Sequence, residues 1–219
     1  MMTLTSKGHF IVVEGLEGAG KSTALNTIKG FLASRTAECI TVREPGGTPT
    51  GELLRHIITN AHAEEMLDAR AELLLLYASR VQLLEQVILP ALARGSWVLA
   101  DRFELSTFAY QGGGRKLDHE FIECLSTHCL KGFRPNLTLF LDISPEKGLR
   151  RAKKRGRIDR IERESLAFFN DVYKSYHDHI RTMEHVVVID ASKPLAQVQS
   201  DIQIALEDYM KHHAANASY

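Results

Sequence analysis

The sequence has few residues of the kinds that build disulfide frameworks, zinc sites and proline-rich linkers. Its 219 residues include three cysteines and six prolines. The cysteines, Cys39, Cys124 and Cys129, are an odd number and form no C-x-x-C pair, which argues against a disulfide scaffold and a structural zinc site. Because they stand in apolar contexts, we expect core thiols rather than a redox centre.

The sequence also lacks an excess of charge of either sign and lacks a long apolar run. Lys and Arg number 27 and Asp and Glu number 27, a balance that argues against a general binder of nucleic acid or of acidic membranes. No segment reaches the roughly 18 consecutive apolar residues of a membrane span. The opening stretch "MMTLTSKGHF" holds one lysine and no apolar core. We expect a cytoplasmic protein with no nucleic-acid or membrane partner and with local anion sites.

The apolar pattern predicts one α/β domain over residues 1–219. The share of apolar residues is 44%, enough for one sizeable core. Short β-branched runs predict buried strands at 9–15, 38–44, 96–102, 136–143 and 185–191. Helical patterns lie between them, at 21–35, 66–94, 117–130, 145–155, 162–183 and 195–212. This alternation predicts a five-stranded parallel sheet with helices on both faces.

The helical stretch 66–94 is apolar over more than one face. Leu73, Leu76, Tyr77, Val81 and Leu84 do not fall on a single stripe. One side would cover the sheet, and the other would either join a homodimer or be wrapped by the same domain. Both alternatives remain open at this point.

The first chemical motif is Gly15-x-x-x-x-Gly20-Lys21-Ser22, a phosphate-binding loop between a predicted strand and a predicted helix. Its glycines let backbone N–H groups approach the phosphates of ATP, and Lys21 brings a charge to the β and γ phosphates. The Ser22 hydroxyl is a ligand for Mg²⁺. The expected ATP-binding residues of the loop are Gly15, Leu16, Glu17, Gly18, Ala19, Gly20, Lys21, Ser22 and Thr23.

The remaining sequence narrows the class of phosphate-loop protein. A GTP-binding switch carries an N-K-x-D guanine motif, and this sequence has none. Motors and regulators of this class are usually larger or carry extra interaction segments. A small kinase fits better, and such an enzyme needs a site for the phosphate acceptor.

Four motifs together resemble those of one family. The stretches "GLEGAGKST", "REPGGT" (43–48), "DRFELSTFAYQGGGR" (101–115) and "RRAKKRGRIDRIE" (150–162) stand in the order and spacing of bacterial thymidylate kinases. The resemblance implies transfer of the ATP γ-phosphate to dTMP, giving dTDP for dTTP biosynthesis. It also implies a phosphate-loop kinase fold with a five-stranded parallel sheet and a mobile lid at about 150–162.

The chemistry of such an acceptor calls for cations rather than a general base. A phosphate monoester is mostly dianionic at neutral pH, so its oxygen is already a nucleophile. Arg43 and Arg102 end predicted strands, where open α/β sheets bind ligands, although both also fit ordinary surface arginines. The resemblance implies that Arg102 grips the acceptor phosphate and acts in catalysis, with Arg43 nearby. Asp101 would either orient Arg102 or hold Mg²⁺ through water, and we favour the Mg²⁺ role.

The basic stretch 150–160 admits three interpretations: a solvated helix face, a nucleic-acid patch, or a lid over phosphates. Its place after the fourth strand and its Gly156 favour the lid. By resemblance, Arg155 and Arg160 stabilise the transferring phosphate as catalytic residues, and Arg151 lies near the adenine and the donor phosphates. Arg157 stands where the family does not require a basic residue, and we expect it to be solvated.

Glu17 is an acid inside a loop built for anions, so it must point elsewhere or meet a cation. The resemblance implies that it faces dTMP and accepts a hydrogen bond from the sugar 3′-hydroxyl. A solvated loop carboxylate is the alternative.

Recognition of the base and sugar rests on resemblance alone. Arg80 matches a family arginine that hydrogen-bonds to the thymine carbonyl, and Thr107 and Gln111 match polar contacts to the base edge. Tyr110 matches an aromatic ring that crowds the sugar 2′ position. Leu76 stands where the family usually has a phenylalanine stacked on thymine. A single methyl is worth about 1–3 kcal/mol in a pocket, so we expect looser discrimination of dTMP from dUMP. The triple glycine 112–114 is expected to form a loop that bends over the acceptor.

Three candidate functions remain. Thymidylate kinase is the first, another nucleotide kinase of the same fold, for example one acting on dUMP, is the second, and a non-catalytic ATP-binding regulator is the third. The third is disfavoured because Lys21, Ser22, Asp101, Arg102 and the arginines of the basic stretch are all present.

Overall fold

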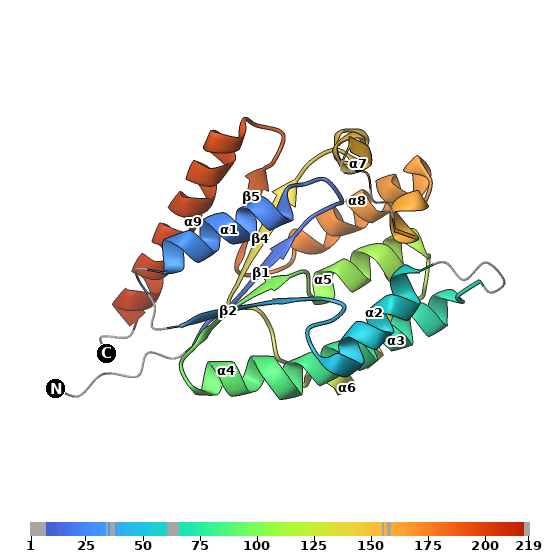
Figure 1. Cartoon of the computed structure of the whole chain (residues 1–219), viewed down its shortest axis with the longest axis horizontal. Coiled ribbons are helices and arrows are strands. Elements are labelled where there is room, and N and C mark those ends of the chain that lie inside the picture. Colours follow the sequence, from blue (N-terminus) through green and yellow to red (C-terminus); the bar gives the residue numbers. More distant parts are fainter. Residues whose placement is uncertain are drawn as a thin grey trace.

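A computed structural model of the chain describes residues 8–216 except 34, 36, 37, 61–65, 155, 157 and 158. Five strands form one parallel sheet in the order β2-β3-β1-β4-β5 (Figure 1). The strands are β1 (Phe10–Glu14), β2 (Cys39–Arg43), β3 (Trp97–Asp101), β4 (Leu137–Asp142) and β5 (Val186–Asp190). Each lies within the predicted run, and the prediction of a five-stranded parallel α/β sheet is confirmed.

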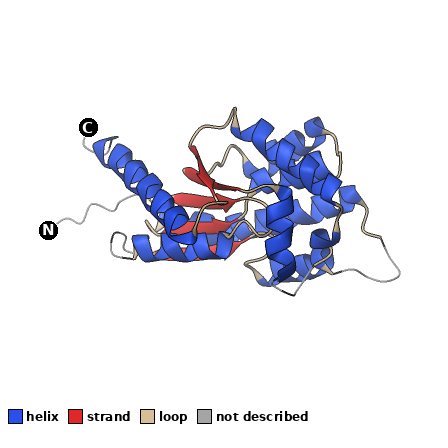
Figure 2. Cartoon of the chain, turned by 90° about the horizontal axis from the view of Figure 1, so that it is seen from above, coloured by secondary structure: helices blue, strands red, loops and turns tan. Residues whose placement is uncertain are grey.

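Helices cover both faces of the sheet (Figure 2). On one face, side chains of α1 (Lys21–Leu32), α8 (Leu166–Ile180) and α9 (Leu195–Asn216) pack against Ile11, Val13 and Leu139. On the other, α3 (Ala69–Leu83), α4 (Leu89–Ala93) and α6 (His119–Leu130) pack against Phe10, Val12 and Val98. The three central strands are therefore buried on both sides, which explains why their sequences are continuous apolar runs.

The remaining elements lie around the carboxyl ends of the strands. They are α2 (Pro49–Thr59), α5 (Glu104–Thr107), α7 (Pro145–Lys154), the π-helical η2 (Phe108–Gly114) and the 3₁₀ turn η3 (Ile161–Arg163). The helix α2 was not predicted, although Thr48 caps it by accepting from the Gly51 N–H and Pro49 opens it.

The predicted helix 66–94 is a continuous helix over Ala69–Ala93 with a π-turn, η1 (Leu84–Ile88), in its middle. The Leu89 N–H bonds to the Leu84 carbonyl, five residues back. Pro90 follows directly, and a proline ring clashes with the carbonyl four residues before it, so the wider turn relieves that clash. By length and composition alone this helix is apolar enough to cross a membrane. Here its residues Leu83, Leu84 and Ile88 are buried against the sheet.

Two expectations about small residues are wrong. Glycines 112–114 do not form a loop but end the helical segment η2, which packs on α8. A Cβ at Gly113 would lie 2.4 Å from the Cβ of Ser175, so only glycine permits this close packing. Among the cysteines, Cys124 is exposed and Cys39 and Cys129 are partly buried. Cys124 is thus no core thiol, because α6 turns it away from the sheet.

Candidate active site

The loop between β1 and α1 has the backbone shape of a phosphate cradle. Gly15, Gly18 and Gly20 have φ values of 138°, 73° and 96°, a region that side chains other than glycine rarely adopt. A Cβ at Gly18 would lie 2.1 Å from the Gly148 carbonyl oxygen. The loop therefore needs glycine both for its turns and for its contact with α7.

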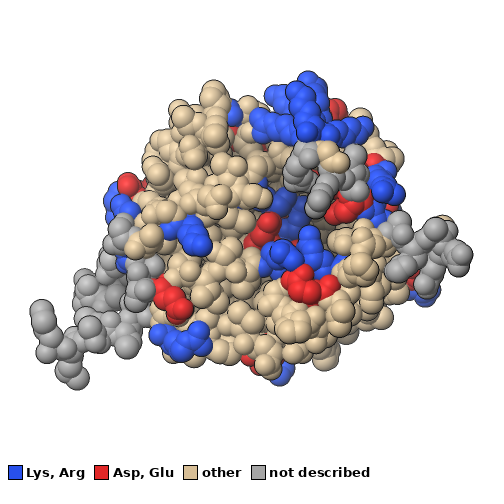
Figure 3. All heavy atoms as spheres, in the orientation of Figure 1, with Lys and Arg blue, Asp and Glu red and all other residues tan. Residues whose placement is uncertain are grey.

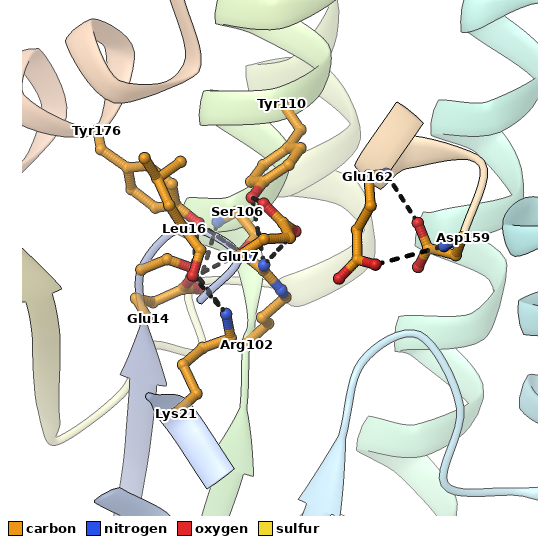
Figure 4. Close-up of polar contacts among 11 residues, drawn as sticks. Glu14, Leu16, Glu17, Lys21, Arg102, Ser106, Tyr110, Asp159, Glu162 and Tyr176 are labelled. Carbon is orange, nitrogen blue, oxygen red and sulfur yellow. Dashed lines mark hydrogen bonds and ion pairs between the residues drawn. The ribbon is translucent and has the colours of Figure 1, made fainter. Parts of the chain in front are cut away.

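Lys21 begins α1 and folds back across this loop. Its ammonium donates to the carbonyl oxygens of Gly15 at 2.9 Å and Leu16 at 3.0 Å (Figure 4). Burial, and then the positive charge of Arg102, lower the pKa of Lys21 to about 8, while Glu17 and Asp101 oppose the shift. The ammonium is held at the loop by neutral carbonyls, which leaves its charge available for an anion.

A cleft opens beside the loop, which we call the phosphate cleft. It is lined by Glu17, Gly18, Gly20, Lys21, Ser22, Thr23, Arg43, Glu44, Arg55, Asp101, Arg102, Arg151, Ala152, Asp159 and Glu162. In the space-filling view, basic and acidic side chains meet in a hollow below the basic surface of α7 (Figure 3). Most of the predicted ATP-site side chains thus share one cleft with the predicted phosphate-binding arginines Arg43 and Arg102.

Asp101, the last residue of β3, has an oxygen that suits a cation. Its Oδ1 atom is buried, and no described residue hydrogen-bonds to it. The Ser22 hydroxyl lies in the same cleft and is exposed. Mg²⁺ is commonly bound by one or two protein oxygens together with substrate phosphates, so this pair fits that ion. The group is small: among the described residues, no cluster of three or more His, Cys, Asp or Glu is placed to hold a metal.

Arg102 is held in a strained backbone conformation that aims its side chain into the site. Its φ is 68°, and its N–H donates to the Val13 carbonyl at 3.0 Å, so the chain turns sharply at the end of β3. The guanidinium then donates to four side chains. They are Glu17 Oε1 at 2.7 Å, Ser106 Oγ at 3.0 Å, Tyr176 Oη at 3.1 Å and Tyr110 Oη at 3.2 Å (Figure 4).

Glu17 meets a cation, as its place in an anion-binding loop requires. Besides Arg102, it accepts a hydrogen bond from the Tyr110 hydroxyl at 2.5 Å. Burial alone would raise the pKa of Glu17, but the charges of Arg102 and Lys21 hold it below the usual value. The carboxylate is therefore ionised and points across the cleft toward α5 and η2.

Glu14 holds two hydrogen-bond partners of Arg102 in place, and this role was not predicted from the sequence. It is fully buried at the end of β1 and accepts from the Phe103 N–H at 2.9 Å and the Ser106 hydroxyl at 2.6 Å. It also accepts from the Tyr176 hydroxyl at 3.0 Å. Because Ser106 and Tyr176 are themselves acceptors for Arg102, the carboxylate fixes the guanidinium through them. The only signal in the sequence was an acid ending an otherwise apolar strand.

A second cleft adjoins the first and contains most of the predicted dTMP residues; we call it the base pocket. Its lining includes the predicted residues Glu17, Leu76, Arg80, Arg102, Thr107, Tyr110 and Gln111. Arg43 is the exception, since it lines the phosphate cleft and ion-pairs with Glu52 at 2.6 Å. Glu17, Glu44, Arg55, Arg102 and Asp159 line both clefts. The two clefts therefore meet at the Arg102–Glu17 ion pair.

Arg80 is buried in the wall of the base pocket, with 2% of its surface exposed. Its Nε donates to Glu44 Oε2 at 2.7 Å, and its Nη2 donates to Thr107 Oγ1 at 2.9 Å and the Phe103 carbonyl at 3.3 Å. Its Nη1 is buried and has no partner among the described residues. Burial raises the pKa of Glu44 to about 7, although the charge of Arg80 opposes that rise. An unpaired donor in a pocket wall is costly unless a ligand accepts its hydrogen bond.

The sequence profile of the thymidylate kinases matches residues 13–202 of the chain. The chain belongs to the thymidylate kinase family. It is 56% identical to a thymidylate kinase of Legionella pneumophila strain Corby over 213 residues, which are 97% of this chain and 100% of the relative. The corresponding enzyme of strain Paris is 55% identical over the same shares. A thymidylate kinase of Colwellia psychrerythraea is 48% identical over 92% of this chain and 95% of its own length.

Membership of the thymidylate kinase family establishes the class of enzyme. The family catalyses the phosphorylation of dTMP, which makes this chain a nucleoside monophosphate kinase and, as in kinases generally, implies ATP as phosphate donor. The phosphate-loop kinase fold predicted from the sequence agrees with this membership. The resemblance drawn from the four motifs is confirmed.

The structure does not gather all the arginines that the family resemblance assigned to the lid. Arg151 lines the phosphate cleft and donates to the Ala191 carbonyl at 2.9 Å. Arg160, in contrast, ion-pairs with Glu72 and donates from Nε to the Ile58 carbonyl at 2.9 Å. Its guanidinium is therefore occupied beside the base pocket rather than directed at the phosphates. Arg155 and Arg157 lie outside the described residues.

Several site residues gave no recognisable signal in the sequence. Arg55 on α2 lines both clefts, and its helix was not predicted. Asp159 and Glu162 cap each other's backbone N–H groups and line the phosphate cleft (Figure 4). Glu44 and Glu72 are buried acids that hold Arg80 and Gln111. The pairings of Glu44 and Glu72 join distant segments, which no local spacing reveals, whereas the Asp159–Glu162 pair is local and was overlooked.

Proposed function

We propose that this chain transfers the γ-phosphate of ATP to dTMP, giving ADP and dTDP in the synthesis of dTTP. The observation that carries the proposal is the junction of the two clefts at Arg102. A base in the base pocket and a triphosphate in the phosphate cleft would bring the acceptor phosphate to the side chain that lines both. The acceptor oxygen and the γ-phosphate could then approach in line.

In this proposal, catalysis depends on stabilising the charge of the phosphates and not on transferring a proton. The phosphate monoester is already dianionic, so no residue removes a proton from it. Lys21 would balance charge on the β and γ phosphates, and Arg102 would do so on the acceptor phosphate. To reach that phosphate, Arg102 would share its donors between Glu17 and the substrate. Glu14, through Ser106 and Tyr176, keeps the guanidinium in place as this exchange occurs.

Mg²⁺ would be held by Ser22 and Asp101 in this scheme. Bound there with the ATP phosphates, the ion supplies charge neutralisation to the transferring group. The buried, unpartnered Oδ1 of Asp101 supports this assignment.

The hydrogen-bonding groups of the base pocket are complementary to a thymine or uracil base. Arg80 Nη1 is a buried donor without a described partner, and Gln111 lines the same pocket. The amide nitrogen of Gln111 donates to Glu72 at 2.7 Å, which leaves its carbonyl oxygen as an acceptor. Thymine and uracil offer the complementary O4 acceptor and N3–H donor, whereas cytosine offers the reverse. Thr107 holds Arg80, and Leu76 gives the base an apolar face.

Sugar recognition would fall to Glu17 and Tyr110. Their hydrogen bond at 2.5 Å brings both side chains to the junction of the clefts, where the deoxyribose would lie. Glu17 would accept from the 3′-hydroxyl, and the Tyr110 ring would crowd the 2′ position. Arg43 would lie beside the acceptor phosphate, with its pairing to Glu52 at the cleft edge.

We further propose that residues 1–219 form one domain in which residues 150–162 act as a lid. Arg151 already lines the phosphate cleft, and Arg155 and Arg160 would join it when the lid closes. For Arg160 this requires release from Glu72. The lid would exclude water from the reacting phosphates.

A homodimer is also part of the proposal. Leu74 on α3 and Phe121 on α6 are 49% and 38% exposed on two helices that contact one another. Such a face suits burial against a second copy of the chain. Sedimentation of the purified protein, with Leu74→Glu as the disrupting variant, tests this point.

With two nucleotides as substrates, we expect the enzyme in the cytoplasm.

The test of the proposed function is ADP release with ATP, Mg²⁺ and a panel of dTMP, dUMP, dCMP and AMP. We expect turnover with dTMP to lead, with dUMP as the nearest competitor because Leu76 cannot stack on the ring. Turnover led by dUMP would favour the alternative nucleotide kinase. ATP binding without acceptor-dependent ADP release would indicate a regulator.

A further inference from the structure

A buried acid behind the base pocket holds Gln111, one of the side chains that line it. Glu72, in the first turn of α3, has 1% of its surface exposed and does not line the base pocket itself. Its Oε1 accepts from Gln111 Nε2 at 2.7 Å and from Arg115 Nε at 3.4 Å. Its Oε2 accepts from Arg160 Nη2 and, more distantly, from Arg115 Nη2 at 3.5 Å.

Glu72 is ionised in this environment. Burial alone would raise its pKa, but hydrogen bonds from Arg160 and Gln111 and the charge of Arg115 hold that pKa below the usual value. An ionised carboxylate accepts hydrogen bonds and cannot donate them. The atom of Gln111 that faces Glu72 must therefore be its amide nitrogen, because the carbonyl oxygen in that place would meet another acceptor.

This constraint fixes what Gln111 presents to the base pocket. With the nitrogen bound to Glu72, the carbonyl oxygen is the amide atom left for a ligand, and no described residue hydrogen-bonds to it. The pocket then combines an acceptor on Gln111 with the unpartnered Nη1 donor of Arg80. That pair matches the edge of thymine and uracil and opposes the edge of cytosine.

We propose that Glu72 is a positioning residue for base choice, which orients the Gln111 amide so that the enzyme accepts thymine and uracil and rejects cytosine. The inference rests on the proposed placement of the base beside Gln111. Glu72 acts through Gln111 and touches no substrate.

The variant Glu72→Gln would test whether the orientation of the Gln111 amide depends on the carboxylate. Arg160 binds at the Oε2 position, so the single oxygen of a glutamine would stay on that side and its NH₂ group would face Gln111. Gln111 would then turn its oxygen toward residue 72 and present its NH₂ group to the pocket. A donor there opposes the N3–H of thymine and accepts the unprotonated N3 of cytosine as a partner.

The experiment measures kcat/KM of the full-length enzyme for dTMP, dUMP and dCMP at saturating ATP and Mg²⁺. We expect Glu72→Gln to lower the dTMP to dCMP ratio by about tenfold or more, since a site built to hydrogen-bond one edge rejects the other strongly. The dTMP to dUMP ratio is expected to stay within about twofold of the wild-type value, because the 5-methyl group lies away from this edge. Ratios of this kind cancel a general loss of folded or active enzyme.

Two further variants make the outcomes distinct. Glu164→Gln removes the other carboxylate that binds Arg115, at 2.5 Å, and does not touch Gln111, so it should leave the dTMP to dCMP ratio unchanged. Gln111→Leu removes the amide itself. If Gln111→Leu leaves the ratio unchanged, the base does not lie beside Gln111, and the proposed placement fails.

If Gln111→Leu lowers the ratio but Glu72→Gln stays within about threefold of wild type, the role of Glu72 is overturned while the placement of the base stands. A fall in Glu164→Gln equal to that in Glu72→Gln would also overturn it, because the effect would then come from Arg115. A fall in Glu72→Gln and Gln111→Leu alone supports the proposal.

Discussion

Apart from Arg102, which lines both, the phosphate cleft and the base pocket hold their charged side chains in different ways. In the phosphate cleft, Lys21 rests on two backbone carbonyls, and Asp101 keeps an unpartnered buried oxygen. In the base pocket, Arg80 is tied at three points and Gln111 is fixed by a buried carboxylate. The first region keeps charge available for phosphates that move during the reaction, and the second leaves only a few atoms of defined polarity free to select a base.

The largest expected effect is on turnover and belongs to the phosphate cleft. Removing the charge in Lys21→Ala or Arg102→Ala should lower kcat by about 10³-fold or more, the order that a charge-stabilising group contributes to phosphoryl transfer. Steady-state ADP release measures this. Arg70→Ala is the matched control, because Arg70 is exposed and pairs only with Asp68 among the described residues. Near-normal turnover in Arg102→Ala would remove Arg102 from the active site.

The base pocket should respond in stability as well as in binding. Arg80→Leu leaves Glu44 buried without its partner, which should lower the free energy of unfolding by about 3–5 kcal/mol. Urea denaturation measures the loss. Burial already raises the pKa of Glu44 to about 7 beside Arg80, so without Arg80 this acid ionises only at higher pH. The double variant Arg80→Leu, Glu44→Gln replaces the unpaired acid with a neutral amide, so we expect it to recover part of the stability, most of all above about pH 7. A double variant no more stable than Arg80→Leu would mean that the unpaired Glu44 is not the cause of the lost stability.

The pH dependence of ATP use should separate the two regions further. With a pKa of about 8, Lys21 loses its proton in the free enzyme as pH rises past that value, so kcat/KM for ATP should fall above about pH 8. Bound phosphates favour the ammonium, so kcat should hold to higher pH. A pH–rate profile between about 6.5 and 9.5 tests this. A kcat/KM that stays flat across that range would contradict the lowered pKa.

The same pKa has a consequence for stability. Because the folded-state pKa lies below the unfolded value of 10.5, the charged form of Lys21 costs folding free energy below about pH 8. This cost disappears as the pH rises from about 8 toward the unfolded value.

The smallest expected effect concerns the 5-methyl group of the base. Leu76→Phe adds a ring to the wall of the base pocket, and an aromatic contact is worth about 0.5–1.5 kcal/mol. We expect the dTMP to dUMP ratio in kcat/KM to rise by about 2–10-fold, with little change in kcat. Ile204→Phe, at an exposed position on α9, serves as control. An unchanged ratio would mean that Leu76 does not face the base.

Without the family resemblance, the sequence predicted the phosphate cleft better than the base pocket, and the reason is physical. The loop from Gly15 to Ser22 is contiguous, and its glycine spacing follows from the backbone shape that phosphate binding requires. Arg102 was found because the carboxyl ends of parallel strands gather at one edge of the sheet. Both signals are local, or follow from topology that the apolar pattern already predicts.

The base pocket depends on pairings between segments far apart in the chain. Glu72 and Gln111 are 39 positions apart, and Glu44 and Arg80 are 36 apart. A single glutamate on a helix, such as Glu72, or in a loop, such as Glu44, is most often solvated, so neither acid attracted notice. Arg160 was expected at the phosphates and instead pairs with Glu72, because the chain after α7 returns alongside α3. Its catalytic role stays a prediction, as does that of Arg155.

The most direct test of this division of roles compares Lys21→Ala with Gln111→Leu in one assay of kcat and of the dTMP to dCMP ratio. We expect Lys21→Ala to lose turnover and keep the base preference. We expect Gln111→Leu to keep kcat within about tenfold and lose the preference. A Lys21→Ala enzyme without preference for dTMP, or a Gln111→Leu enzyme that retains it, would contradict these separate roles.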